Sequence, residues 1–77
     1  MTGTLDLAGR LKRLRRDRDW SQQRLAEAAG VSYMVITRIE QGLSKEPTIL
    51  SMVKLADALG VTLDELVGRT PPRHPSK

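Results

Sequence analysis

The stretch that decides the fold is QQRLAEAAGVSYMVITRIEQ, from Gln22 to Gln41. Two short amphipathic segments flank Gly30, a residue type that adopts the left-handed conformation at the end of a helix. Ser32 follows closely and is a good helix N-cap. Because so little chain joins the two segments, the helices cannot lie antiparallel, and a short turn that contains glycine sets them at about 90–120°. The stretch therefore predicts a helix-turn-helix.

Three other residues in this stretch meet the packing needs of that geometry. Two helices that cross closely need a small residue where they meet, and Ala26 stands there. The second helix needs apolar residues on its inner side, and Ile36 and Ile39 lie at helical spacing. Because these requirements are all met within one short window, the prediction of a helix-turn-helix is specific.

Residues typical of helices and of helix starts also occur on both sides of this stretch. Before the stretch, Leu7, Leu11 and Leu14 alternate with basic residues and predict an amphipathic helix that ends near Asp19. Ser21 is the expected N-cap of the helix that follows.

After the stretch, a helix is expected from Thr48 to Gly60, and Thr62 and Glu65 form a capping box for another. The expected apolar positions of the fourth helix are Ile49, Met52, Val53, Leu55, Ala56 and Leu59. No strand alternation is present in the sequence. The expected fold class is all-α, a compact domain of five short helices.

Length and composition limit the other possibilities. A chain of 77 residues suits one domain, which we expect at residues 5–68, between a disordered N-terminus at 1–4 and a disordered, proline-rich basic tail at 69–77. Cysteine is absent and His74 is the single histidine, so we expect no metal, no cofactor and no enzymatic site. Neither a signal peptide nor an apolar run of about 20 residues is apparent, so a cytoplasmic location and no membrane partner are expected.

The charge distribution favours a polyanionic partner. Thirteen Lys and Arg against nine Asp and Glu give a net charge of +4. Nine basic and five acidic residues precede or include Lys45, and four of each follow it, so the excess lies in the N-terminal part. DNA is the first candidate partner and an anionic membrane surface the second. A solvated helix face explains the same excess equally well.

At this point the sequence resembles a known family, the lambda-repressor-like helix-turn-helix domains of the xenobiotic-response-element regulators of bacteria and phages. The resemblance rests on LKRLR (11–15), WSQQRLA (20–26), AGVS (29–32), ITRIEQG (36–42), PT (47–48) and LADALGV (55–61). The loop at 42–47 is one residue longer than in the common form. Tyr33 and Met34 replace the small or polar pair that often begins the recognition helix.

The resemblance implies that the helix at 32–41 enters the major groove of double-stranded DNA. The base contacts it implies are Tyr33, Met34, Thr37 and Arg38. Arg38 suits a two-point pair with guanine O6 and N7. Two alternatives stay open: Arg38 contacts phosphate only, and Tyr33 and Met34 pack against the preceding helix.

Further residues are expected to contact phosphates, which position a domain without specifying sequence. They are Gln22, Ser32, Gln41, Ser44, Lys45, Arg10 and Arg13. Gln22 begins a helix, where backbone N–H groups favour an anion, and the resemblance implies that it also braces side chains of the recognition helix. It is otherwise an ordinary surface residue, and the charge of Arg10 and Arg13 serves solubility equally well.

The same resemblance assigns structural roles. Arg15 and Glu40 are expected to form an ion pair between the first and third helices. A homodimer is expected on a pseudo-palindromic operator, with two recognition helices about 34 Å apart. Its interface is expected at Leu63, Leu66 and Val67, although Leu66 also suits the core.

The function predicted on this basis is a sequence-specific DNA-binding transcriptional regulator, acting as a dimeric repressor. The alternative is an antitoxin or co-regulator whose main partner is a protein, such as a toxin or RNA polymerase. A toxin-neutralising surface would distinguish the two, and the short segment after Val67 offers little room for one.

Overall fold

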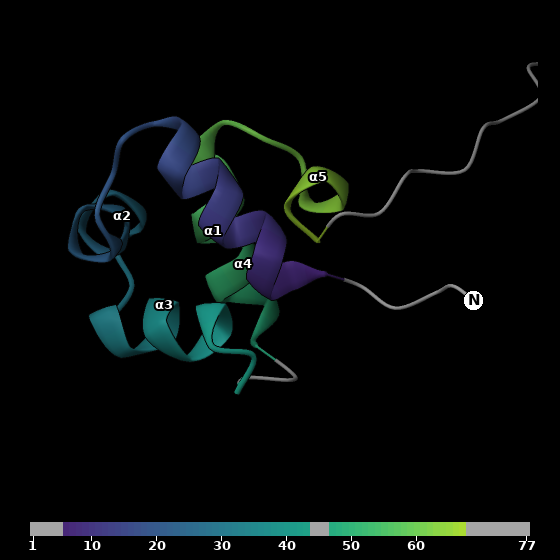
Figure 1. Ribbon diagram of the computed structural model, residues 1–77. Coiled ribbons are helices and arrows are strands. Elements are labelled where there is room, and N and C mark those ends of the chain that lie inside the picture. The colour runs from purple at the N-terminus through teal and green to yellow at the C-terminus, as the bar shows by residue number, and fades with distance from the viewer. Residues whose placement is uncertain (1–5, 44–46, 68–77) are drawn as a thin grey trace, which may run out of the picture.

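The computed structural model describes residues 6–43 and 47–67. These residues form five α-helices and no strand, so the predicted all-α class is confirmed (Figure 1). The helices are α1 (Leu7–Asp17), α2 (Gln22–Ala29), α3 (Tyr33–Glu40), α4 (Ile49–Leu59) and α5 (Leu63–Val67). The predicted phosphate contacts Ser44 and Lys45 lie outside the described residues, as do the segments 1–4 and 69–77 that were expected to be disordered. None of the five helices is both long and apolar enough to cross a membrane.

Side-chain caps start the helices where the sequence predicts. Ser21, Ser32 and Thr48 each accept a hydrogen bond from the backbone N–H three residues on, at 3.0, 3.3 and 3.1 Å. These bonds satisfy N–H groups that have no partner within the helix. At the other end, α2 and α4 stop at Gly30 and Gly60, which adopt left-handed conformations with φ of 71° and 70°.

The turn between α1 and α2 holds a feature that the sequence did not indicate. α1 ends at Asp17, and Asp19 then adopts φ of 56°, a conformation that aspartate tolerates better than most residues. Next to it, the Arg18 guanidinium donates to the carbonyl of Leu14 at 2.9 Å and to the carbonyl of Leu59. Arg18 therefore ties the end of α1 to the end of α4.

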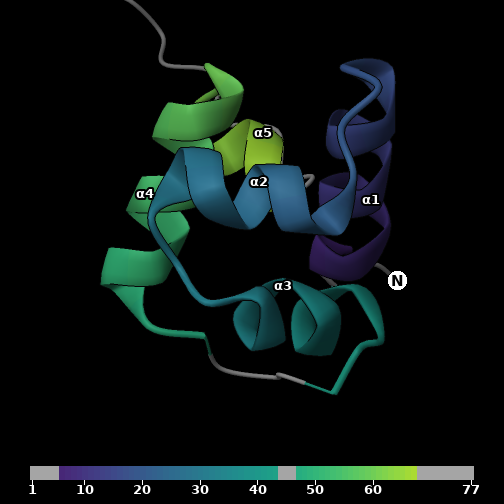
Figure 2. The same cartoon turned by 90° about the vertical axis from the view of Figure 1, so that its left-hand side faces the viewer.

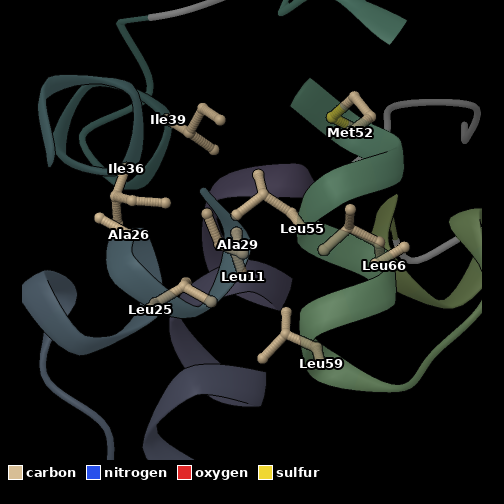
Figure 3. Close-up of a cluster of buried hydrophobic side chains, with 11 residues drawn as sticks. Leu11, Leu25, Ala26, Ala29, Ile36, Ile39, Met52, Leu55, Leu59 and Leu66 are labelled. Atoms are coloured by element: carbon tan, nitrogen blue, oxygen red, sulfur yellow. The ribbon is translucent and has the colours of Figure 1, made fainter. Parts of the chain in front are cut away.

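All five helices contribute to one apolar core (Figure 3). Full burial of a leucine or isoleucine side chain stabilises a fold by about 1.5–3 kcal/mol, so these contacts hold the helices together. The buried side chains are Leu11, Leu25, Ala26, Ala29, Ile36, Ile39, Met52, Leu55, Ala56, Leu59 and Leu66.

The start of α4 departs from the prediction. Ile49 and Val53 were assigned to its apolar face, but they are 74% and 36% exposed, and Leu50 is exposed beside them. The buried stripe of α4 begins only at Met52, one turn into the helix. Ile49 precedes that turn and extends past the edge of the core, and Val53 is rotated by about 100° from Met52. The sequence identified both as apolar positions of this helix, and the structure leaves both outside the core.

The helix pair α2–α3 occupies one side of the molecule. In Figure 1 α2 lies to the left of α1 and α4, α3 lies at the lower left beneath them, and α5 lies on the right. Figure 2 faces this pair directly, with α3 below α2 and with α1 and α4 flanking them. One surface of α3 therefore packs inward and the opposite surface is open.

Candidate nucleic-acid interface

The turn between α2 and α3 is built by backbone hydrogen bonds. The N–H of Gly30 donates to the carbonyls of Ala26 and Glu27 at 2.9 and 3.3 Å, and the N–H of Val31 donates to Ala26 at 3.1 Å. These bonds close the end of α2, and Ser32 starts α3 immediately afterwards. The direction of α3 relative to α2 is therefore set by a three-residue turn at 30–32.

The predicted base contacts lie mostly on the open face of α3. Tyr33 and Met34 are 46% and 56% exposed, and Arg38 is exposed one turn further on. Thr37 is half-buried, and its hydroxyl donates to the Met34 carbonyl at 3.0 Å. Met34 and Arg38 therefore share the accessible side of the helix with Tyr33, and Thr37 lies at its margin.

A hollow of about 370 Å³ lies between α3 and the start of α4. Met34, Arg38 and Ser32 line its α3 side. Thr48 and Ser51 line its α4 side, and these two hydroxyl groups were not among the predicted contacts. Thr48 is the N-cap of α4, an eleven-residue helix that follows the loop after α3.

Arg15 and Glu40 join α1 to α3. Arg15 Nε lies 2.7 Å from Glu40 Oε2, and Nη2 lies 2.9 Å from Oε1. Burial alone would raise the pKa of Glu40, but hydrogen bonds from Arg15 and Gln22 and the charge of Arg15 outweigh burial and lower it. The hydrogen bond from Arg15 to Glu40 correspondingly raises the pKa of Arg15. Both groups are therefore charged at neutral pH.

Gln22 links this ion pair to the open face of α3. Its Nε2 donates to Glu40 Oε1 at 3.0 Å, and its Oε1 accepts from the Tyr33 hydroxyl at 3.3 Å. The resemblance implied that Gln22 contacts phosphate and also braces side chains of the recognition helix, and its bonds to two residues of α3 agree with the bracing. The partner atoms themselves follow from how α2 crosses α3.

The other predicted phosphate contacts are dispersed. Ser32 and Gln41 cap the two ends of α3 and are exposed. Arg13 is exposed on α1. Arg10 Nε donates to the Glu65 carbonyl at 3.1 Å, so Arg10 lies against α5. The structure therefore groups Gln22 and Ser32 with the open face of α3 and draws Arg10 toward α5.

The three predicted dimer residues differ in how exposed their side chains are. Leu66 is fully buried in the core, which is the alternative that the sequence left open, so its side chain offers no surface to a partner. The physical reason is that α5 is short and uses Leu66 to close the core beside α1. Leu63 is 41% exposed and Val67 is half-buried.

The crossing of α2 and α3, with an exposed second helix, defines a helix-turn-helix protein. A model of the family described as helix-turn-helix matches residues 11–66. The chain belongs to this family, in its lambda-repressor-like branch. Among the described residues, no group of three or more His, Cys, Asp or Glu side chains is placed to hold a metal ion.

Curated relatives have similar names. The chain is 40% identical over 67 residues to the HTH-type transcriptional regulator SutR of Escherichia coli, covering 87% of this chain and 36% of SutR. It is 36% identical over 58 residues to the uncharacterized HTH-type transcriptional regulator y4dJ of Sinorhizobium fredii, covering 75% of this chain and 74% of that relative. For the HTH-type transcriptional regulator AnsR of Bacillus subtilis, identity is 35% over 60 residues, covering 78% of this chain and 51% of AnsR. The chain thus spans about a third of SutR and about half of AnsR.

Proposed function

We propose that this chain binds double-stranded DNA with sequence selectivity and acts in transcriptional regulation. The observation that supports this most directly is the orientation of α3. Ile36 and Ile39 are buried and fix its inner side in the core, while Tyr33, Met34 and Arg38 extend from its outer side. A major groove admits an α-helix, and side chains of this variety can contact base edges there.

Phosphate contacts are proposed at the edges of the same face. Gln22 is the first residue of α2, and Ser32 is the N-cap of α3, so both stand where helix N–H groups attract an anion. Gln41, Arg13 and the loop residues Ser44 and Lys45 complete the proposed set, with Arg10 at its periphery. The net charge of +4 favours approach to a polyanion.

A homodimer on a pseudo-palindromic operator is proposed because one domain of this size contacts too few base pairs to specify a genomic site. The proposed interface uses Leu63 and Val67, without Leu66. Occupation of a promoter by such a dimer would repress transcription by excluding polymerase. This role involves binding without catalysis, and we propose that it is exercised in the cytoplasm.

The alternative function, in which a protein is the main partner, has one observation in its favour. Ile49, Leu50 and Val53 expose apolar side chains at the start of α4, and exposed apolar groups suit protein contacts. An antitoxin or co-regulator would use such a surface.

Selection of bound sequences from a random duplex library tests the proposal. The folded protein should enrich a two-fold symmetric motif with half-sites about 10 base pairs apart, one helical turn. Affinity should also fall with salt, by about 0.9 log units per log unit of salt for each neutralised phosphate. If the folded protein enriches no motif, the DNA-binding proposal fails and the alternative is favoured. An enriched motif without two-fold symmetry would contradict only the proposed homodimer.

A further inference from the structure

Four side chains form a continuous series of hydrogen bonds from the interior to the open face of α3. Arg15 donates to Glu40, Gln22 donates to Glu40, and Tyr33 donates to Gln22. The series begins at a buried ion pair and ends at a tyrosine that is nearly half exposed. The direction of each hydrogen bond in the series determines whether the Tyr33 hydroxyl can donate to a ligand or accept from it.

Each bond in the series has only one possible direction. A guanidinium only donates and a carboxylate only accepts, so Glu40 accepts from both neighbours. Gln22 must therefore turn its NH2 group toward Glu40, at 3.0 Å, and its carbonyl oxygen toward Tyr33. This orientation of the amide follows from the chemistry of Glu40.

The amide oxygen of Gln22 only accepts, so the Tyr33 hydroxyl must give it its single proton, over 3.3 Å. The phenolic oxygen then retains only lone pairs for any other partner. Toward the outside, Tyr33 is a hydrogen-bond acceptor and not a donor.

The partners available on DNA differ in exactly this property. In the major groove only the amino groups of adenine (N6) and cytosine (N4) donate. Guanine O6 and N7, thymine O4 and the phosphate oxygens all accept. An acceptor at Tyr33 therefore matches two bases and mismatches the other two and the backbone.

We infer that Tyr33 is a specificity-determining residue that accepts a hydrogen bond from the amino group of an adenine or a cytosine. The inference rests on the proposed function, which brings the first turn of α3 to the base edges. Glu40 and Gln22 are positioning residues in it, because they fix the direction of the Tyr33 hydroxyl without contacting the base.

The test compares base preference at each position of the selected motif for the wild type and for Tyr33→Phe, which keeps the ring and removes the hydroxyl. The wild type should prefer adenine or cytosine at one position of the half-site by about two- to tenfold, the range for a neutral hydrogen bond. Tyr33→Phe should make the four bases equivalent there and leave other positions unchanged. Arg38→Ala is the matched control, since it should preserve this position.

Two further measurements isolate the hydrogen bond. If the preferred base is adenine, its replacement by deoxynebularine, which lacks only the 6-amino group, should weaken the wild type by the same factor and leave Tyr33→Phe unaffected. If the preferred base is cytosine, its replacement by the analogue that lacks only the 4-amino group should likewise weaken the wild type and leave Tyr33→Phe unaffected. Gln22→Leu removes the acceptor for the Tyr33 proton, so the same position should then also accept guanine and thymine.

The possible failures are distinguishable. A clear motif with no position sensitive to Tyr33→Phe overturns the inference and leaves the proposed function intact. A uniform loss of affinity on all sequences would mean that the hydroxyl donates to a phosphate, and a wild-type preference for guanine or thymine at the sensitive position would mean that it donates to a base. Either result overturns the inference. If no motif is enriched by the folded protein, the proposed function and the inference fail together.

Discussion

Arg15 and Glu40 meet in a two-point ion pair, with side chains only 11% and 2% exposed. A third bond from Arg15 Nη1 reaches the Trp20 carbonyl at 2.8 Å, so one guanidinium connects α1, the turn before α2, and α3. The position of the open face of α3 relative to the rest of the domain depends on this connection.

Removal of either partner should therefore destabilise the fold. Arg15→Ala and Glu40→Ala each leave an uncompensated charge in a mostly buried place, and we expect a loss of about 3–5 kcal/mol in the free energy of unfolding. Thermal and urea denaturation followed by circular dichroism measure the loss. The matched control is Arg16→Ala, an exposed arginine on the same helix, which should stay within about 0.5 kcal/mol of the wild type. Equal stability of all three variants would contradict the structural role.

Stability should fall in acid. The pKa of Glu40 is lower in the folded state than in the unfolded state, so the unfolded state binds a proton more readily. The stabilisation is complete above the ordinary glutamate pKa, about 4.3, and is lost as the pH falls toward and through the lower folded pKa. Urea denaturation at several pH values between neutrality and acid should show this decline. In Glu40→Gln the decline should be smaller, and an identical pH dependence would exclude Glu40 as its source.

The glycine that ends α2 should be needed for its conformation alone. Gly30 has φ of 71°, and a Cβ there would meet no atom within 4 Å. Gly30→Ala should therefore cost about 1–2 kcal/mol through left-handed strain without a clash. Gly30→Asn should lose less, because asparagine tolerates this conformation. If both substitutions were equally harmful, a steric cause would have to replace this explanation.

The capping box of α5 should contribute measurably despite the shortness of the helix. Thr62 Oγ1 accepts from the Glu65 N–H at 3.0 Å, and Glu65 Oε1 accepts from the Thr62 N–H at 2.9 Å. Thr62→Ala should lower the free energy of unfolding by about 1 kcal/mol. Thr62→Ser retains the oxygen and should remain close to the wild type. Failure to distinguish alanine from serine would show that the cap adds nothing.

Arg38 should affect sequence preference without affecting the fold. Arg38→Ala removes an exposed side chain, so helical content should be unchanged. At one guanine of the proposed operator, discrimination should fall by about 1–3 kcal/mol. Competition binding with single-base variants measures this. A loss of affinity that is uniform over all variants would instead assign Arg38 to a phosphate.

The features that the sequence predicted well are those that depend on nearby residues. Ser21, Ser32 and Thr62 cap helices through bonds to residues three positions away, and Gly30 and Gly60 end helices by their own backbone freedom. A short window of sequence is therefore enough to predict these N-caps and helix ends.

The features that were missed depend on how distant helices meet. Arg10 reaches the carbonyl of Glu65 and Arg18 reaches that of Leu59, contacts across 55 and 41 positions. The bracing of the recognition helix by Gln22 was expected from the resemblance alone, and its partners Glu40 and Tyr33 depend on how α2 crosses α3. The exposure of Ile49 could not be predicted, because helical periodicity identifies an apolar side of a helix but not the point along the helix where the core ends.

One backbone hydrogen bond joins the two ends of the described domain. The N–H of Asp6 donates to the carbonyl of Val67 at 3.2 Å, so the chain enters and leaves the five helices at the same corner. Because these two residues already lie together, a short peptide could join them without moving the helices. The order of the helices along the chain is then not essential to their packing. The domain should tolerate circular permutation, and also insertion as a unit into a loop of a host protein.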